Sequence, residues 1–295
     1  MTVASRASAF PVSAGLALAA SLGLCTATAA ACQTKTVGTG ATDPEHQSVS
    51  EYNLGLDAFQ HADFRVALQH ALRAVQLDDQ NARATYLTSL VYQGFCGGPR
   101  GFDDVDCHLG DAEKYARMTM KLAPTYLDAN NLLGEVLINE KRFPEAIAVL
   151  KPLTTDPSFT SIHLAWGNLG WAQVLSGDLE AGIASLKNSV TEPRFVVGFY
   201  RLGIAYEKKG DLAQADANLT SAVDGEAGKS FQDAFEERGK VRAKLGQPDL
   251  AKADFERCKA LAPDTLSGKR CADALAGSGP VPSPAGSNAP TGGKL

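Results

Sequence analysis

The six cysteines are the residues of this chain with the clearest potential chemistry. Four of them form two local pairs, Cys96 with Cys107 and Cys258 with Cys271, each separated by about a dozen residues. In an exported, oxidising compartment such pairs are expected to be disulfides, and each would stabilise the fold by roughly 2–4 kcal/mol. The alternative is four buried free thiols. A zinc site is disfavoured because no Cys-x-x-Cys occurs and only His108 lies beside a cysteine of the mature chain.

The fifth and sixth cysteines belong to the N-terminal segment. Residues 1–31 contain a basic start, an apolar stretch and then small residues, which is the layout of an export signal peptide. Cys32 follows the small residues directly and resembles a lipobox cysteine, whose thiol is acylated after cleavage. Acyl chains would anchor the protein to a membrane by roughly 0.8 kcal/mol per buried CH2. We expect lipidation at Cys32; lipidation at Cys25 and plain signal cleavage within residues 27–29 are the alternatives.

No group of side chains indicates catalysis. The five histidines are scattered, and no phosphate loop, nucleophile elbow or paired-carboxylate motif occurs. The acidic cluster of Asp103, Asp104 and Asp106 lacks the spacing of an EF-hand loop, so a solvated acidic loop is favoured over a calcium site. A net charge of −5 lacks the basic footprint that nucleic-acid binding requires. We therefore predict a protein that is not an enzyme, with no cofactor, no metal and no nucleic-acid partner.

A recurring Leu-Gly pair, followed about a dozen residues later by Ala, indicates the architecture that positions these groups. The pair, or its equivalent, occurs at Leu54-Gly55, Leu133-Gly134, Leu169-Gly170, Leu202-Gly203 and Arg238-Gly239. This pattern resembles the tetratricopeptide repeat (TPR), with W-x2-L-G-x2-Y, then A-x3-F, then P, at a period of about 34 residues. Small residues let two helices approach closely while large residues fill the surrounding gaps. The sequence predicts an all-α TPR solenoid of about six helix pairs over residues 48–276.

Several segments depart from the repeat. The second repeat carries an insertion between Cys96 and Cys107, and such insertions form loops on one face of a solenoid, often the binding face. The Cys258–Cys271 bridge would join the last repeat to a short C-terminal capping helix, because stacked repeats leave an apolar end that needs cover. Residues 32–47 are expected to be a linker after the lipid anchor. Residues 277–295, rich in Gly, Pro and Ser, are expected to be a disordered tail.

The first helices of stacked repeats line an inner groove. Residues three before and one after each Leu-Gly glycine, with others one turn further on, are expected to point into it. The groove positions, from the first repeat to the sixth, are Tyr52, Leu56, Phe59, Tyr86, Leu90, Asn131, Glu135, Ile138, Trp171, Val174, Tyr200, Ile204, Glu236 and Lys240. Contiguous exposed apolar surface marks a protein-binding site, and an apolar peptide or helix would fit such a groove. The alternative is that these residues pack against the neighbouring repeat.

Residues 48–264 also resemble a particular family, the type IV pilus biogenesis and stability lipoproteins PilF, PilW and Tgl. The more particular residues are 128–134, which open the third repeat with two adjacent asparagines, and the stretch from Pro157 to Gly170, which ends in Asn-Leu-Gly. The paired cysteines and the Pro/Gly-rich tail are most similar to the branch that contains Tgl.

The resemblance implies an outer-membrane pilotin. Such a protein is anchored by acyl groups at the periplasmic face, binds subunits of the secretin and promotes their multimerisation for type IV pilus assembly and pilus-dependent motility. It implies contact through the first repeats, where the apolar groove residues gather. We expect the protein itself to be a monomer. The alternative function is a periplasmic TPR scaffold for cell-wall enzymes or another envelope complex.

Overall fold

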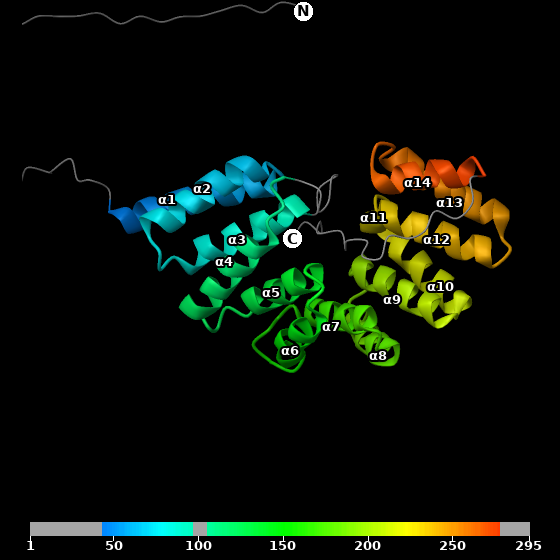
Figure 1. The fold of residues 1–295 in the computed structure, drawn as a ribbon, viewed down its shortest axis with the longest axis horizontal. Coiled ribbons are helices and arrows are strands. Elements are labelled where there is room, and N and C mark those ends of the chain that lie inside the picture. The colour runs from blue at the N-terminus through cyan, green and yellow to red at the C-terminus, as the bar shows by residue number, and fades with distance from the viewer. Residues whose placement is uncertain (1–42, 97–104, 278–295) are drawn as a thin grey trace, which may run out of the picture. The chain divides into compact units, whose positions relative to one another are not determined.

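The structure is a computed structural model that describes residues 43–96 and 105–277 (Figure 1). The expected signal peptide, the expected lipidation at Cys32 and the expected tail beyond residue 277 lie outside the described residues. Within the described ranges, no helix is long and apolar enough to cross a membrane.

The described residues form fourteen helices and no strand. The helices of the first three repeats are α1 (Pro44–Gln60), α2 (Phe64–Leu77), α3 (Ala82–Cys96), α4 (Leu109–Leu122), α5 (Asp128–Asn139) and α6 (Phe143–Leu153). Those of the last three repeats are α7 (Ile162–Ser176), α8 (Leu179–Ser189), α9 (Val196–Lys209), α10 (Leu212–Val223), α12 (Gln232–Lys244) and α13 (Pro248–Leu261). The short α11 (Gly225–Gly228) lies between the last two pairs, and α14 (Leu266–Leu275) follows them.

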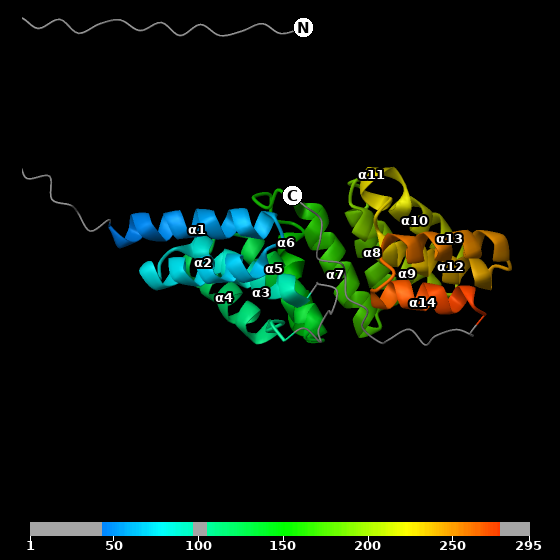
Figure 2. The same ribbon diagram turned by 90° about the horizontal axis from the view of Figure 1, so that it is seen from above.

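The helices pack as six successive pairs. Within each pair the two helices contact each other extensively, and each pair contacts the next one along the chain (Figures 1 and 2). The first helices α1, α3, α5, α7, α9 and α12 also contact one another in that order, and α14 covers the last pair. The predicted all-α TPR solenoid with six helix pairs and a C-terminal capping helix is confirmed.

The Leu-Gly pair explains the close crossing of the two helices in a repeat. A Cβ atom added at Gly134 would lie 2.4 Å from Leu150 Cγ, and one added at Gly203 would lie 2.6 Å from Leu219 Cγ. The glycine therefore leaves the space that a leucine of the second helix fills. The preceding leucine packs inward in the middle repeats, since Leu133 and Leu169 are at most 3% exposed. In the first repeat Leu54 is 54% exposed, because no earlier repeat covers it.

The solenoid begins earlier than expected. Helix α1 starts at Pro44 rather than at residue 48, so the last residues of the predicted linker are helical. The cause is local: the Asp43 side chain accepts a hydrogen bond from the Glu45 backbone N–H, and Pro44 stands at the start of the helix, where its fixed φ suits the first turn.

Both disulfides are present, as predicted. Cys96 at the end of α3 is bonded to Cys107, with Cα atoms 4.6 Å apart, and this bridge closes the insertion of the second repeat. Cys258 of α13 is bonded to Cys271 of α14, with Cα atoms 6.2 Å apart, and both residues are fully buried. The second bridge therefore holds the capping helix against the last repeat.

Candidate partner-binding groove

The first repeat presents its three apolar groove residues on one partly covered surface. Tyr52, Leu56 and Phe59 of α1 are each partly exposed and pack against a buried core that includes Ala58, Leu87 and Val91. Their inner edges are thus held in place by packing while their outer edges remain accessible.

The second repeat continues this surface. Tyr86 and Leu90 of α3 are partly exposed and pack on Ala112, Leu132 and Val136. The five residues Tyr52, Leu56, Phe59, Tyr86 and Leu90 are called the apolar half-groove below. Their role in binding stays a prediction, but their partial exposure is the geometry that the prediction needs.

Tyr126 extends the apolar half-groove and was not predicted. It lies in the turn before α5, and its ring centroid is 4.8 Å from that of Tyr86. Burial, with nearby Asp128, raises the pKa of Tyr126 to about 12, and burial together with Tyr126 and Asp128 raises the pKa of Tyr86 further. Both phenols are therefore neutral at physiological pH. The sequence analysis placed groove residues by their spacing from each Leu-Gly glycine, which applies only within a helix, so it could not find Tyr126.

Trp171 and Tyr200 do not belong to the accessible surface. Their exposed fractions are 5% and 2%, which corrects the expectation that they project into an open groove. The same correction applies to Ile138, Val174 and Ile204, which are also buried. The Tyr200 ring packs 4.9 Å from the Phe231 ring of the following repeat. The Trp171 ring lies 5.8 Å from the Arg201 guanidinium of α9. For these two residues, packing against the neighbouring repeat uses the surface that a partner would need.

A chain of polar side chains crosses the first helices of the middle repeats. Asn168 Nδ2 of α7 donates to Asn131 Oδ1 of α5 over 3.1 Å, and Arg201 Nη1 of α9 donates to Asn168 Oδ1 over 2.7 Å. Glu135, one turn after Asn131 on α5, lies close enough to the Gln93 side chain of α3 for that amide to favour the charged form of Glu135 and lower its pKa. We call Gln93, Asn131, Glu135, Asn168 and Arg201 the polar belt.

The two charges of the polar belt are incompletely compensated. Burial raises the pKa of Glu135, against the opposing effects of Arg201 and Gln93. Burial also lowers the pKa of Arg201 to about 10, although Glu135 favours its charged form. Among the described residues, the two buried side-chain polar atoms without a hydrogen-bond partner are Gln93 Oε1 and Arg201 Nε, and both belong to this belt. Buried polar atoms are normally hydrogen-bonded, so two unpaired polar atoms within one side-chain network are unusual.

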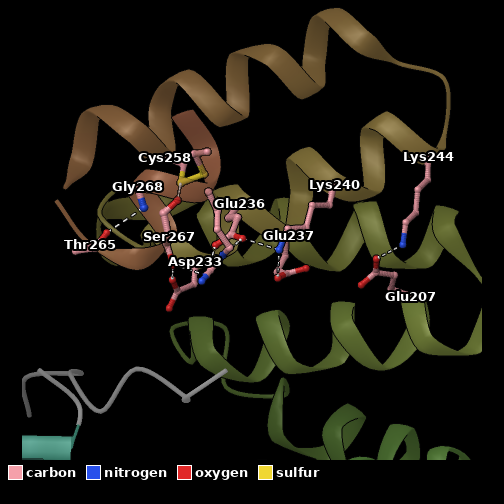
Figure 3. A network of polar contacts seen from close by, with 12 residues as sticks. Glu207, Asp233, Glu236, Glu237, Lys240, Lys244, Cys258, Thr265, Ser267 and Gly268 are labelled. Carbon is pink, nitrogen blue, oxygen red and sulfur yellow. Dashed lines mark hydrogen bonds and ion pairs between the residues drawn. A yellow bond between two sulfur atoms is a disulfide. The ribbon is translucent and has the colours of Figure 1, made fainter. Parts of the chain in front are cut away.

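The groove positions of the sixth repeat are occupied by ion pairs (Figure 3). Glu236 is only 1% exposed and accepts hydrogen bonds from Arg270 Nε at 2.6 Å and Nη2 at 2.7 Å. Lys240 Nζ lies 2.5 Å from a Glu236 oxygen and 2.9 Å from a Glu237 oxygen. Arg270 belongs to the capping helix, so the predicted groove residues Glu236 and Lys240 fasten α14 to α12.

The same ion pairs shift the acidity of these carboxyl groups. Burial favours the neutral form of Glu236, but Arg270 and Lys240 outweigh it and hold its pKa below the ordinary glutamate range. Burial raises the pKa of Glu237, against Lys240. Ser267 of α14 donates to Asp233, whose pKa burial also raises. At this end of the groove, the charged side chains of α12 are therefore paired with one another or with α14.

No cluster of three or more His, Cys, Asp or Glu side chains suited to a metal ion occurs within the ranges that the structure describes. His70 is paired instead with Glu51, at 2.6 Å between Nδ1 and Oε2. The partly exposed groove residues Tyr52, Leu56, Phe59, Tyr86, Leu90 and Asn131 carry aromatic, aliphatic and amide groups.

Comparison with known proteins agrees with this fold. Residues 232–265 match a family model described as a tetratricopeptide repeat. No curated protein matches the chain by sequence.

Three solved structures are similar over most of this chain. PilW, described as a widely conserved type IV pilus biogenesis factor, has a TM-score of 0.61 at 21% identity, covering 75% of this chain and 96% of its own. PilF of Pseudomonas aeruginosa has a TM-score of 0.58 at 15% identity, covering 77% and 96%. The APC/C assembly Cut9–Hcn1 has a TM-score of 0.66 at 15% identity, covering 80% of this chain and 44% of that one. At these identities the likeness shows the TPR solenoid fold alone.

Proposed function

We propose that this protein is an outer-membrane pilotin of the type IV pilus machine, which binds secretin subunits through its apolar half-groove and promotes their multimerisation. The proposal is supported by similarity to PilW and PilF over nearly the full length of each, together with the features of the sequence. The two disulfides favour the branch of that family that contains Tgl.

The observation that carries the proposal is the apolar half-groove. Tyr52, Leu56, Phe59, Tyr86 and Leu90 remain partly exposed in the first two repeats, whereas the corresponding positions of the fourth and fifth repeats are buried. Partly exposed aromatic and aliphatic side chains gathered on the first helices of two successive repeats favour a protein partner. A TPR scaffold is typically non-catalytic, and we infer that this protein acts by binding, as a monomer.

Membrane anchoring would place this surface where secretin subunits assemble. We propose that acyl groups on Cys32 tether the protein to the periplasmic face of the outer membrane. The chain from Cys32 to Pro44 reaches at most roughly 40 Å when fully extended, at about 3.5 Å per residue. The first repeats would then lie near the membrane, and tethering would raise the effective concentration of captured subunits there.

The decisive experiment compares secretin assembly with and without the protein. Deletion of the gene should reduce heat-resistant secretin multimer while total secretin monomer persists, and pilus-dependent motility should fall. Unchanged multimer together with normal motility would reject the pilotin and leave the envelope scaffold as the remaining function.

A point variant localises the activity to the groove. Leu56→Glu combined with Leu90→Glu should abolish secretin multimer while the purified protein keeps its helix content. Leu250→Glu is the matched control, because Leu250 of α13 is 49% exposed on the last repeat. Equal loss of multimer in both variants would show that charge anywhere disrupts the protein and would contradict the groove assignment. Cys32→Ala should abolish acyl labelling, and persistent labelling would reject Cys32 as the anchor.

A further inference from the structure

The side-chain amide of Asn131 has a fixed orientation. Arg201 carries only donor groups, so the Asn168 atom that accepts from its Nη1 over 2.7 Å must be the carbonyl oxygen. The other end of the same amide, Asn168 Nδ2, therefore faces Asn131 and donates to Asn131 Oδ1 over 3.1 Å. Arg201 thus sets both amides, and Asn131 holds its oxygen toward Asn168 and its nitrogen away from it.

This orientation presents a hydrogen-bond donor to the groove. Asn131 is partly exposed, whereas Asn168 and Arg201 are 5% and 3% exposed. Asn131 Nδ2 is not one of the buried side-chain atoms that lack a hydrogen-bond partner among the described residues. A partner that reaches Asn131 therefore meets its N–H groups and not its carbonyl oxygen.

Asn131 adjoins the apolar half-groove. Tyr86 and Leu90 of α3 pack on Leu132, the residue that follows Asn131 on α5. The Tyr86 ring also lies 4.8 Å from the ring of Tyr126, in the turn that leads into α5. A segment that lies on the apolar half-groove and continues toward the third repeat therefore passes Asn131.

The charges around Asn131 favour a neutral acceptor. Asp128 lies three residues before Asn131 and Glu135 four residues after it, so the three side chains share one face of α5. Both acids are partly exposed, and both would repel a carboxylate of the partner. A main-chain carbonyl is neutral, and every residue of the partner carries one.

The conformation of the partner decides whether such a carbonyl is available. In a helix the carbonyl groups accept from N–H groups of the same helix, except in the last turn. In an extended segment the carbonyl groups have no partner within the segment, and successive side chains point to opposite faces. A donor at Asn131 therefore favours an extended segment over an amphipathic helix.

We propose that the groove binds an extended segment of its partner, and that Asn131 Nδ2 donates a hydrogen bond to a main-chain carbonyl oxygen of that segment. Asn131 touches the partner, whereas Arg201 is a positioning residue that acts on Asn131 only through Asn168. The inference rests on the proposed use of the groove and names the conformation of the segment that the groove accepts.

The test uses displayed random dodecapeptides selected on the purified protein, independently of any secretin. Selected peptides should share apolar residues at alternate positions, the spacing of an extended segment. The best peptide is then measured against Asn168→Asp, in which the new carboxylate still accepts from Arg201 but has no hydrogen to donate to Asn131. The Asn131 amide should turn round and present its oxygen to the groove, and peptide binding should weaken at least about tenfold, because two acceptors then face each other.

Two further variants isolate the contact. Asn188→Asp is the matched control, because Asn188 is exposed on α8 and the change in charge is the same; peptide binding should stay within about twofold of the wild type. Asn131→Ala should itself weaken binding, and in that background Asn168→Asp should have no further effect, as a double-mutant cycle requires of coupled residues. A purely structural role of Asn168 would give the same loss with or without Asn131.

Ester bonds in the peptide identify the acceptor, because an ester carbonyl accepts hydrogen bonds more weakly than an amide carbonyl. Replacing the peptide bonds one at a time should weaken binding to the wild type at one position and leave binding to Asn131→Ala unchanged there. Far-UV circular dichroism checks the fold of each variant. If Asn168→Asp does not fold, the ester series with the wild type and Asn131→Ala decides alone.

Equal peptide binding by the wild type and a folded Asn168→Asp would overturn the inference. The absence of an ester-sensitive position coupled to Asn131 would also overturn it, since the acceptor would then belong to a partner side chain. Apolar residues spaced three and four apart, as in a helix, or no selected peptide at all would contradict it equally. Secretin multimerisation is measured separately, so a pilotin that binds a helix and a groove that binds extended peptides without secretin activity are distinguishable outcomes.

Discussion

Adding one methyl group at Gly170 tests the close crossing of α7 and α8. An added Cβ would lie 2.7 Å from Leu186 Cγ, 2.9 Å from the Gly182 carbonyl oxygen and 2.9 Å from the Leu186 backbone nitrogen. Two of these three atoms belong to the backbone of α8, so the clash cannot be relieved by a side-chain rotation. The helices must separate, and the leucine packing that surrounds the crossing is disrupted.

The magnitude follows from two opposing effects. Overpacking a core costs about 1–3 kcal/mol, and the backbone contacts place Gly170→Ala at the upper end of that range. Alanine favours a helix over glycine by up to about 1 kcal/mol. The net expectation is a loss of about 2 kcal/mol from the free energy of unfolding, concentrated in the fourth repeat because a solenoid is held together by nearest-neighbour contacts.

The assay is urea unfolding followed by far-UV circular dichroism, with hydrogen exchange of α7 and α8 measured in parallel. Gly110→Ala is the matched control, since nothing lies within 4 Å of its added Cβ and it should be neutral or slightly stabilising. A Gly170→Ala midpoint equal to or above that of the wild type would refute the reasoning, as would exchange that increases elsewhere but not in α7 and α8.

Three further predictions concern the disulfide of the capping helix, the ion pairs of Glu236, and the burial of Trp171 compared with Tyr52. Replacing Cys258 and Cys271 by Ala should lower the stability of α14 by about 3 kcal/mol, from a loop with a sequence separation of 13, and hydrogen exchange that is unchanged in α14 would contradict this. The pKa of Glu236 is lowered in the folded state, so the stability that its ion pairs contribute is fully present above the ordinary value of 4.5 and is lost as pH falls through the folded value. The difference in the free energy of unfolding between the wild type and Glu236→Gln should therefore shrink on acidification. A difference that stays constant with pH would exclude the ion pairs as its source. Trp171→Ala should lower the free energy of unfolding by about 3–5 kcal/mol because the ring is buried, whereas Tyr52→Ala should weaken partner binding with a smaller loss of stability. A larger loss of stability in urea unfolding for Tyr52→Ala than for Trp171→Ala would show that Trp171 belongs to the groove surface after all.

The repeat architecture was predictable because its determinants are local. The glycine of each Leu-Gly pair packs against the next helix along the chain, which begins a few residues after its own helix ends; Gly134 packs against Leu150, and Gly203 packs against Leu219. The disulfides were predictable for the same reason, since each joins cysteines a short distance apart in sequence. Periodicity therefore predicted the helix pairs and their order, and the short separations of the cysteines predicted both disulfides.

The accessible part of the groove was not predictable from the same rule. Whether Trp171 or Tyr200 is exposed depends on how closely the next repeat approaches, and the rule for one repeat contains no information about that approach. Tyr200 is covered by Phe231 because a helix pair from farther along the chain supplies the ring. Likewise, the polar belt joins Gln93, Glu135 and Arg201 from three repeats, and its existence depends on their spatial order.

The distribution of burial along the groove restricts where a partner can act. The apolar half-groove is partly exposed in the first two repeats, Asn131 and Glu135 of the polar belt are partly exposed in the middle, and Glu236 is occupied by Arg270 at the far end. A ligand would have to break a buried ion pair to enter the last repeat, and breaking such a pair by removing one partner costs about 3–5 kcal/mol. Under the proposed function the secretin segment therefore lies on the repeats nearest the lipid anchor, and the disulfide-bonded cap stabilises the opposite end without contacting it.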